Sequence, residues 1–362
     1  MNIRITAIDC AVVSVPLQRR IVTPIHQITT IDNVLVTVHT DAGIDGVAYL
    51  WTFGAERAAV LLHMVRDLAR FVVGEDPRST ASLWTTLWRE TNFFGHAGVA
   101  MLAQSALDTA CWDIKARALD EPLWRLLGGT RRPLPVYAGG LFLSDSLDAI
   151  VEEAEGYVAQ GFRAMKMRTG AADPCDDIAR VEAVRGAIGP DVVLMVDVVQ
   201  GWTTERAIRL GRELARFDLA WIEDPVPFDD HAGLRKIAAA LDTPVCAGEN
   251  DYSKLGFARL MDGDCIDIAM ADLQRVGGIS EWMKVAAMAE SRSMRITPHV
   301  FHEVSVHLMS AVANGFWIEY VSWWDVLFTQ PLALVDGHFT APDLPGLGLA
   351  FDWNRLDALR VH

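Results

Sequence analysis

The sequence predicts an α/β barrel joined to a smaller amino-terminal domain, and three observations carry this prediction. Asp197, Glu223 and Glu249 each follow a short apolar run, and they lie at two equal intervals of 26 residues. A helix-length segment follows each run, so the repeat is that of a buried parallel strand and its helix. The chain has 362 residues, roughly 100 more than the ~250 residues of a single barrel.

The amino-terminal domain, residues 1–128, reads as strands first and helices second, which indicates an α+β arrangement. Alternating residues predict strands over 3–16, 33–39 and 47–50, and helical spacing of apolar residues covers about 56–119. Two loops, 23–28 and 51–54, are candidates for a lid. They carry His26 and Trp51, which we expect to contact substrate.

Strand and helix segments alternate through residues 129–330, after a turn at Gly128-Gly129 and Pro133. The intervening helices have apolar faces, so this stretch predicts the barrel. Residues 331–362 are rich in turn residues, and we expect them to fold back on the first domain. The expected strand ends lie near Tyr137, Arg168, Asp197, Glu223, Glu249, Asp272, His299 and Glu319.

The composition argues against nucleic acid or an anionic membrane as a partner, because the net charge is −15 and no basic run interrupts it. The amino terminus lacks an apolar signal core, and no stretch approaches 18 apolar residues, so we expect a soluble cytoplasmic protein. The five cysteines are scattered and include no Cys-x-x-Cys pair. Reduced thiols fit this pattern better than disulfides or a zinc site.

The three acids predict a metal site, since the carboxyl ends of neighbouring barrel strands face one point. Carboxylates without cysteine or histidine select Mg²⁺, with Mn²⁺ as an alternative, over zinc. A single acid at a strand end is more often a helix N-cap than a ligand, but an N-cap does not explain three acids at one interval. Asn250 follows Glu249 directly and is a candidate substrate contact.

Other strand ends add possible acid–base groups. Lys166 and Arg168 are two residues apart, so both side chains point to the same face of their strand. Either could be a structural ion-pair partner of the acids. Asp272 with His299 would form an oriented pair in which the carboxylate fixes the imidazole tautomer, and such a histidine is a general base.

Taken together, these motifs resemble the enolase superfamily and, within it, the mandelate racemase subgroup, over nearly the whole chain. The segments that carry the resemblance are 105–115 with 122–129, Lys166-Met-Arg168 within 164–170, Val196-Asp197, Ile222-Glu-Asp-Pro225, Gly248-Glu-Asn250, 272–278, Pro298-His299 and Ile318-Glu319. The resemblance implies a (β/α)7β barrel with an amino-terminal capping domain, a small carboxylate substrate and a homo-oligomer.

The resemblance also implies a role for each residue. Asp197, Glu223 and Glu249 would bind Mg²⁺, and Lys166 would neutralise the substrate carboxylate. His299, oriented by Asp272, would exchange the α-proton. A protonated Glu319 would then hydrogen-bond the enediolate that forms, and the bound metal would stabilise the same anion.

Two departures from the subgroup pattern bear on the reaction. Arg168 stands where a second lysine usually serves as the base on the face opposite the histidine, and deprotonating a free arginine at neutral pH costs on the order of 8 kcal/mol. Val199 stands where an asparagine is common near the substrate. Racemisation needs a base on both faces, whereas one histidine can remove the α-proton and protonate a leaving hydroxyl. A hydro-lyase acting on an acid sugar or dihydroxy acid is therefore favoured.

Two other functions remain open. Val199 and the aromatic residues of the cap suit a less polar substrate, which keeps a mandelate-like racemase or epimerase as the alternative. A barrel that binds a metal–carboxylate complex without turning it over is a third possibility. It would lack a competent base, whereas this chain has both His299 and Asp272.

Overall fold

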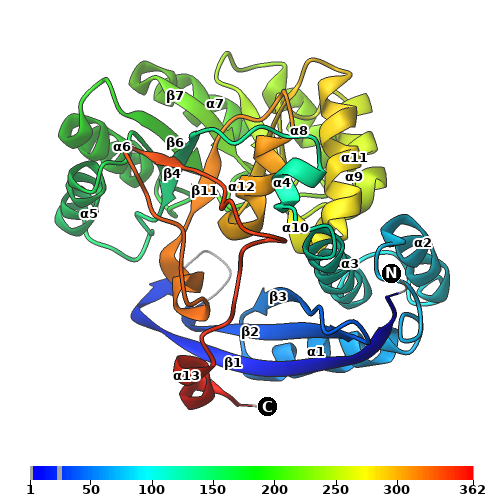
Figure 1. Ribbon diagram of the computed structural model, residues 1–362. Helices are drawn as coiled ribbons and strands as arrows, with labels where there is room; N and C mark the ends of the chain where they lie inside the picture. Colours follow the sequence, from blue (N-terminus) through cyan, green and yellow to red (C-terminus); the bar gives the residue numbers. More distant parts are fainter. Residues whose placement is uncertain (1–2, 23–26, 362) are drawn as a thin grey trace.

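The computed structural model describes residues 3–22 and 27–361, and its larger part is a barrel of parallel strands (Figure 1). The strands are β4 (Leu134–Gly139), β5 (Ala164–Arg168), β6 (Val193–Asp197), β7 (Leu219–Glu223), β8 (Val245–Ala247), β9 (Ile268–Asp272), β10 (Arg295–His299) and β11 (Ile318–Tyr320). They pair in the order β10-β9-β8-β7-β6-β5-β4-β11. Ile296 closes the ring, because its N–H donates to the carbonyl of Asn314 at 3.0 Å and its carbonyl accepts from Phe316 N–H at 2.9 Å.

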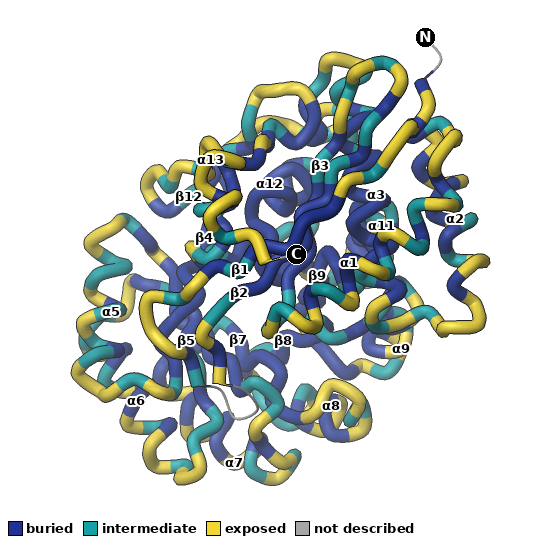
Figure 2. Tube along the Cα trace, turned by 90° about the horizontal axis from the view of Figure 1, so that it is seen from below, coloured by how far each residue is buried: buried dark blue, intermediate teal, exposed yellow. Residues whose placement is uncertain are grey.

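An α-helix or a helix pair follows each strand from β4 to β10, whereas a 3₁₀ helix follows β11, so the predicted (β/α)7β barrel is confirmed. The helices are α5 (Leu147–Ala159), α6 (Pro174–Ile188), α7 (Thr204–Leu214) with a 3₁₀ turn at Ala215–Phe217, α8 (His231–Ala238), α9 (Ser253–Asp262), α10 (Leu273–Val276) with α11 (Ile279–Glu290), α12 (His302–Ser310), and the 3₁₀ helix Ser322–Leu327. Side chains of Ser146, Asp173, Thr203 and Asp230 cap the first four of these helices by accepting backbone N–H bonds. Exposed residues gather on these outer helices, while the strands are buried (Figure 2).

The interior of the barrel is closed below the strand ends by a layer of buried side chains, which we call the barrel floor. Trp221, the largest of them, is fully buried. The members of the floor are Tyr137, Ala164, Met195, Trp221, Cys246, Ile268 and Met270. Because side chains two residues apart on a strand share a face, the residues after this layer project into the open mouth.

The amino-terminal part is an antiparallel sheet covered by helices. Its strands are β1 (Ile5–Val22), β2 (Gln27–Thr40) and β3 (Gly46–Thr52), and its helices are α1 (Ala55–Ala69), α2 (Thr80–Glu90), α3 (Val99–Arg117) and the short α4 (Leu123–Leu126). Helix α3 is buried along most of its length and lies between this sheet and α10 and α11 of the barrel (Figure 1). Gly46 permits this approach, because a Cβ there would lie 2.2 Å from the carbonyl oxygen of Ala110.

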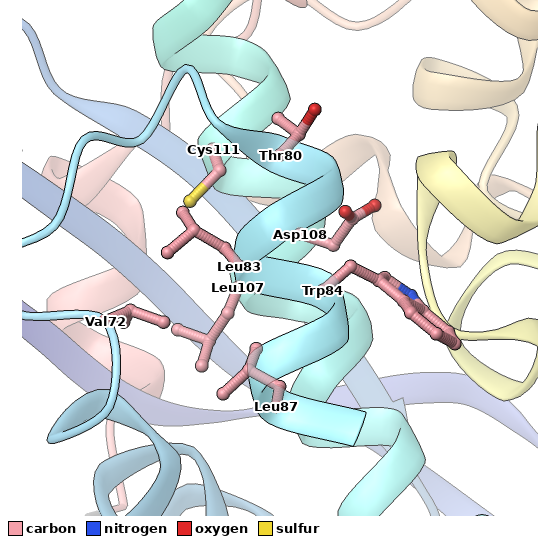
Figure 3. Close-up of a pocket in the computed structure, with 8 residues that line it drawn as sticks. All are labelled: Val72, Thr80, Leu83, Trp84, Leu87, Leu107, Asp108 and Cys111. Carbon is pink, nitrogen blue, oxygen red and sulfur yellow. The ribbon is translucent and has the colours of Figure 1, made fainter. Parts of the chain in front are cut away.

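Helices α2 and α3 leave a small cavity of about 10 Å³ between them (Figure 3). Its lining is mainly apolar, with Leu83 and Leu87 from α2 facing Leu107 from α3. A space of this size is close to the minimum that holds one water molecule. The cavity is therefore a packing feature of the cap and is too small for a substrate.

The carboxy-terminal segment returns to both parts of the molecule. It contains β12 (His338–Phe339), which pairs antiparallel with β4, and α13 (Trp353–Leu356) with a final 3₁₀ turn at Asp357–Leu359. Val361 N–H donates to the carbonyl of Val12 in β1 at 2.9 Å. Domain limits at 128/129 and 330/331 stay a prediction. Within residues 3–22 and 27–361, no helix is long and apolar enough to cross a membrane.

Two local expectations for the cap were wrong. The first strand continues to Val22, and the second strand begins at Gln27. Gln27 and Ile28 therefore belong to β2 and not to a loop. A register shift between Pro16 and Ile21 interrupts the alternation that would have revealed this extension. Trp51 lies in β3 and is buried, whereas we expected it in a loop. His26 lies outside the described residues.

Candidate active site

Asp197, Glu223 and Glu249 converge at the mouth of the barrel. Asp197 and Glu223 are the last residues of β6 and β7 and pair across that ladder, and Glu249 lies two residues beyond β8. One carboxylate oxygen from each lies within 4.8 Å of the others. Glu223 is 0 % exposed and Asp197 is 5 % exposed, while Glu249 is partly exposed. The three acids thus form one cluster that is open on the side of Glu249.

The backbone after each strand sets the direction of these carboxylates. Val199 has φ 50°, and this conformation turns its N–H back to donate to Asp197 Oδ1 at 2.8 Å. Gly248 has φ 123°, and a Cβ there would lie 2.6 Å from the ring of Phe257, so the turn that places Glu249 requires glycine. This turn also explains why β8 ends before Glu249.

Lys166 and Arg168 from β5 are paired with the acids. Lys166 Nζ lies 2.5 Å from Glu223 Oε1, 2.9 Å from Glu319 Oε1 and 3.8 Å from Asp197 Oδ2. Arg168 Nη1 forms an ion pair with Asp197 Oδ2. Burial alone would lower the pKa of both cations, but the neighbouring carboxylates outweigh it and raise both pKa values, so both side chains stay charged.

His299 and Asp272 form the pair expected from the sequence spacing. Nδ1 of His299 lies 2.7 Å from Asp272 Oδ2, and Nε2 lies 3.3 Å from Glu249 Oε2. Burial works to lower the pKa of His299, but the charge of Glu249 and the hydrogen bond to Asp272 raise it to about 9. Asp272 Oδ1 also accepts from Arg275 N–H at 2.8 Å, so Asp272 caps α10 as well. Nδ1 is therefore anchored, and Nε2 faces the acid cluster.

Glu319 lies between a backbone donor and Lys166. Its Oε2 accepts from Val300 N–H at 3.2 Å, and its Oε1 lies against Lys166. Burial would raise the pKa of Glu319, but the positive charges of Lys166, His299 and Arg168 hold it at about 2. These cations favour the ionised form of Glu319, and the protonated role that the resemblance implies stays a prediction.

A cavity of about 200 Å³ opens above this cluster. Of the expected substrate contacts, Trp51, Val199 and Asn250 line it, and Lys166 and Glu319 do not. The remaining lining residues are Ile21, Ile28, Phe53, Phe142, Arg168, Asp197, Gln200, Glu249, Arg275, His299, Val300, Val321 and Trp323. Most of the lining residues are apolar, and the β1–β2 hairpin contributes Ile21 and Ile28 to this apolar wall.

Arg275 and Phe142 line the cavity and were missed in the sequence. Arg275 stands one helical turn after Asp272, a spacing that could have placed it beside His299. Its Nη1 lies 3.4 Å from Asp272 Oδ2. Phe142 and Trp323 follow β4 and β11, and their rings stack with centroids 6.2 Å apart. Their position just after barrel strands could therefore have identified these residues as part of the cavity lining.

The acid cluster fits a hard divalent cation. Magnesium takes oxygen ligands at about 2.0–2.1 Å, so opposite ligands are about 4.2 Å apart, and the three carboxylates already lie within a comparable span of 4.8 Å. Burial and the charges of Asp197, Glu319 and Glu249 raise the pKa of Glu223 although Lys166 touches it. Additional positive charge at this point would therefore be favourable, which is what a bound cation supplies.

An α/β barrel whose mouth joins an acid triad, a buried lysine and a histidine–aspartate pair defines a class of metal-dependent acid–base enzymes. The sequence comparisons agree. Residues 7–128 match the family described as mandelate racemase / muconate lactonizing enzyme, N-terminal domain, and residues 149–355 match enolase C-terminal domain-like. The chain therefore belongs to the mandelate racemase / muconate lactonizing enzyme family of the enolase superfamily.

Three relatives are similar over most of their length. A 3,6-anhydro-alpha-L-galactonate cycloisomerase of Streptomyces coelicolor is 34 % identical over 96 % of this chain and 97 % of its own. An L-talarate/galactarate dehydratase of Salmonella typhimurium is 34 % identical over 89 % of this chain and 81 % of its own. The structure of an L-talarate dehydratase from Polaromonas sp. JS666, complexed with Mg and L-glucarate, superposes with a TM-score of 0.91 at 32 % identity, covering 99 % and 98 %.

Proposed function

We propose that this protein is a magnesium-dependent hydro-lyase that removes the α-proton of an acid sugar or small dihydroxy acid and expels the 3-hydroxyl, giving a 2-keto-3-deoxy acid. The observation that carries the proposal is the position of His299: its Nδ1 is fixed on Asp272 and its Nε2 faces the acid cluster at 3.3 Å from Glu249. The dehydratase relatives of Salmonella and Polaromonas support the same reaction class.

Asp197, Glu223 and Glu249 would hold the cation. When bound, Mg²⁺ would supply charge that offsets the second negative charge on the substrate carboxylate as the α-proton leaves. Lys166 is buried and remains charged, so it adds a fixed positive charge beside Glu223. The chain's own part of this stabilisation is therefore in place before substrate arrives.

His299 would carry the proton in both halves of the elimination. A cation held by Glu249 would offset the carboxylate charge that raises the pKa of His299, which favours the neutral imidazole. Neutral Nε2 then takes the α-proton, and the electrons of that C–H bond pass into the substrate carboxylate. They return to form the C2–C3 double bond as the C3–O bond breaks. The same Nε2–H then protonates the departing hydroxyl, so water leaves and the enol becomes the keto acid. Asp272 keeps the ring oriented and stabilises the imidazolium between these two transfers.

Arg168 supports elimination over racemisation. Its guanidinium is paired with Asp197 and its pKa is raised, so it does not offer a free base on the second face. Among the described residues that line the cavity, His299 is the one imidazole, and no lysine is present. A reaction that needs one acid–base group suits this lining better than one that needs two.

A second candidate is the opening of a cyclic ether by the same chemistry. If the oxygen on C3 is part of a ring, its elimination opens the ring and releases no water. The Streptomyces coelicolor relative, named as a cycloisomerase of an anhydro sugar acid, favours testing this substrate type. The mandelate-like racemase remains the alternative that requires no leaving group.

The three reactions separate in deuterated buffer with Mg²⁺. Aldonic and aldaric acids, an anhydro sugar acid and mandelate are incubated with the protein and followed by NMR. A 2-keto-3-deoxy acid carrying deuterium at C3 supports elimination. Deuterium at C2 without any keto acid from the dihydroxy acids would establish racemisation in its place.

A variant pair tests the assignment of His299. His299→Asn should lose at least 10³-fold in turnover, on the order expected for a general base, while Mg²⁺ binding by calorimetry is retained. His63→Asn, on the exposed face of α1, is the control and should change neither. Retained turnover in His299→Asn would place the base elsewhere in the site.

We further infer a homo-oligomer in the cytoplasm, acting on a small carboxylate. Phe93 and Phe94 are 102 % and 73 % exposed on the loop between α2 and α3, and adjacent exposed aromatic rings are typical of association surfaces. Light scattering of the purified protein measures the assembly directly, and a monomer at all concentrations would contradict it.

A further inference from the structure

Glu223 has both carboxylate oxygens engaged by side chains that are themselves buried. Lys166 Nζ lies 2.5 Å from Oε1, and Trp221 Nε1 donates to Oε2 at 2.9 Å. We propose that Trp221 is a positioning residue: its indole N–H fixes the plane of the Glu223 carboxylate and thereby sets the affinity of the site for a divalent cation. This inference rests on the proposed function, because it assumes that the acid cluster binds metal.

The three acids of the cluster are oriented in different ways. Asp197 accepts from the backbone N–H of Val199 at 2.8 Å and pairs with Arg168. Glu249 is partly exposed, so water reaches it. Glu223 is 0 % exposed and is the last residue of β7, so water cannot replace a lost donor there. The direction of its second oxygen therefore depends on Trp221.

Trp221 is itself fixed by the barrel floor. It lies two residues before Glu223 on β7, so both side chains point into the barrel, one layer above the other. Its ring lies edge-on to the ring of Tyr137, with centroids 5.4 Å apart and an interplanar angle of 80°. The centroid of the Phe316 ring lies 6.0 Å away. The indole is 0 % exposed. Packing thus holds the ring, and the ring holds the N–H against Glu223.

Loss of this donor should weaken metal binding more than it weakens the fold. Donors that orient metal ligands are worth about 10–100-fold in metal affinity when they are removed. Trp221→Phe keeps an aromatic ring in the floor and deletes the N–H. We expect its Mg²⁺ dissociation constant to rise by that factor, measured by calorimetry on the metal-free full-length protein.

Trp282→Phe is the matched control. Trp282 in α11 is also 0 % exposed, and its Nε1 donates to the carbonyl of Ala271 at 3.1 Å, which is not a metal ligand. Both variants lose a buried indole and should melt at lower temperature than the wild type. Only Trp221→Phe should lose Mg²⁺ affinity, and equal dissociation constants for the two variants would overturn the proposal.

A second replacement covers the case in which Trp221→Phe does not fold. Incorporation of 3-benzothienylalanine at position 221 preserves the shape of the indole and removes only the N–H. Weaker Mg²⁺ binding with an unchanged melting temperature supports the positioning role, and wild-type affinity refutes it. If the wild-type protein itself fails to bind Mg²⁺, the proposed function fails and this inference fails with it, so the two failures are distinguishable.

Discussion

Val199 and Val300 are β-branched residues with φ angles of 50° and 44°, and each lies just after a strand that ends in a site residue. Such conformations are costly for branched side chains and collect at functional sites. Here these conformations allow two hydrogen bonds: Val199 N–H donates to Asp197, and Val300 N–H donates to Glu319. At position 199 the backbone thus makes a polar contact to Asp197, although the side chain is apolar.

The strain at Val199 leads to a stability prediction. Asparagine tolerates positive φ better than valine, so Val199→Asn should raise the free energy of unfolding by about 1 kcal/mol. The backbone contact to Asp197 is retained. Urea unfolding measures the change, and Val335→Asn, at an exposed position without positive φ, should be close to neutral. A destabilised Val199→Asn would mean that the valine's apolar contacts outweigh the strain.

At the scale of elements, the β1–β2 hairpin reaches from the cap to the barrel. Ile21 and Ile28 line the cavity. Next to them, Arg19 forms ion pairs with Asp145 at 3.3 Å and with Glu153 of α5. This contact anchors the strand that carries Ile21 and so keeps the apolar wall over the acid cluster.

Arg19→Ala should therefore affect substrate binding and leave stability almost unchanged. Arg19 is 47 % exposed, so its ion pairs are worth at most about 1 kcal/mol. We expect KM to rise several-fold with kcat retained, and faster hydrogen exchange in residues 17–22. Arg20→Ala is the control, because Arg20 bonds Gln27 within the hairpin. Equal KM changes in both variants would argue against an anchor to the barrel.

The elements also indicate where sequence reasoning works. Arg168, Asp197, Glu223, Asp272 and His299 end their strands as expected, because buried parallel strands are short apolar runs with clear ends. The length of the hairpin was not predictable, since its pairing resumes after an irregular stretch. Distances among the acids, and the low pKa of Glu319, depend on contacts between distant strands that no local pattern encodes.

At the scale of the whole molecule, the cap and the barrel share hydrogen-bonding groups. Asp108 of α3 accepts from Ser280 N–H at 2.8 Å and from Ser280 Oγ at 2.6 Å, at the first turn of α11. A cap residue therefore supplies the N-terminal cap of a barrel helix, where negative charge is favourable. Tyr49 OH likewise donates to Glu303 of α12 at 2.8 Å.

Removing the Asp108 side chain from the first turn of α11 should destabilise the whole chain. Asp108→Ala leaves the part-buried N–H and O–H of Ser280 without this acceptor, which costs about 1–3 kcal/mol. We expect one cooperative unfolding transition at lower temperature in calorimetry. Asp67→Ala, at a partly exposed position of α1, should have little effect. Two separate transitions in the variant, with the barrel unchanged, would contradict a shared role.

His307 is expected to make the stability of the folded protein sensitive to acid. Its Nδ1 accepts from Trp124 N–H of α4 at 3.3 Å, and its Nε2–H donates to the carbonyl of Leu347 at 3.1 Å. Protonation would destroy the acceptor, and burial lowers the pKa of His307 from 6.5 to about 4. The unfolded chain then binds one more proton between these values, so stability present above pH 6.5 is lost as the pH falls toward 4.

The expected loss is on the order of 3 kcal/mol across that range. It is measured as the slope of unfolding free energy against pH. His307→Gln should lower the slope by the amount that corresponds to about one bound proton. His63→Gln should leave the slope unchanged. An unaltered slope in His307→Gln would assign the acid sensitivity to other groups.

The hairpin and the barrel mouth belong to distant stretches of one chain: Ile21, Ile28 and Phe53 lie near its beginning, and the groups proposed to move protons lie between Lys166 and Glu319. Recombination could therefore exchange the opening segment for that of a relative and give a new range of acceptable molecules, while the reaction chemistry is inherited intact. Laboratory evolution of this scaffold should accordingly diversify that opening segment and leave the strand tips alone.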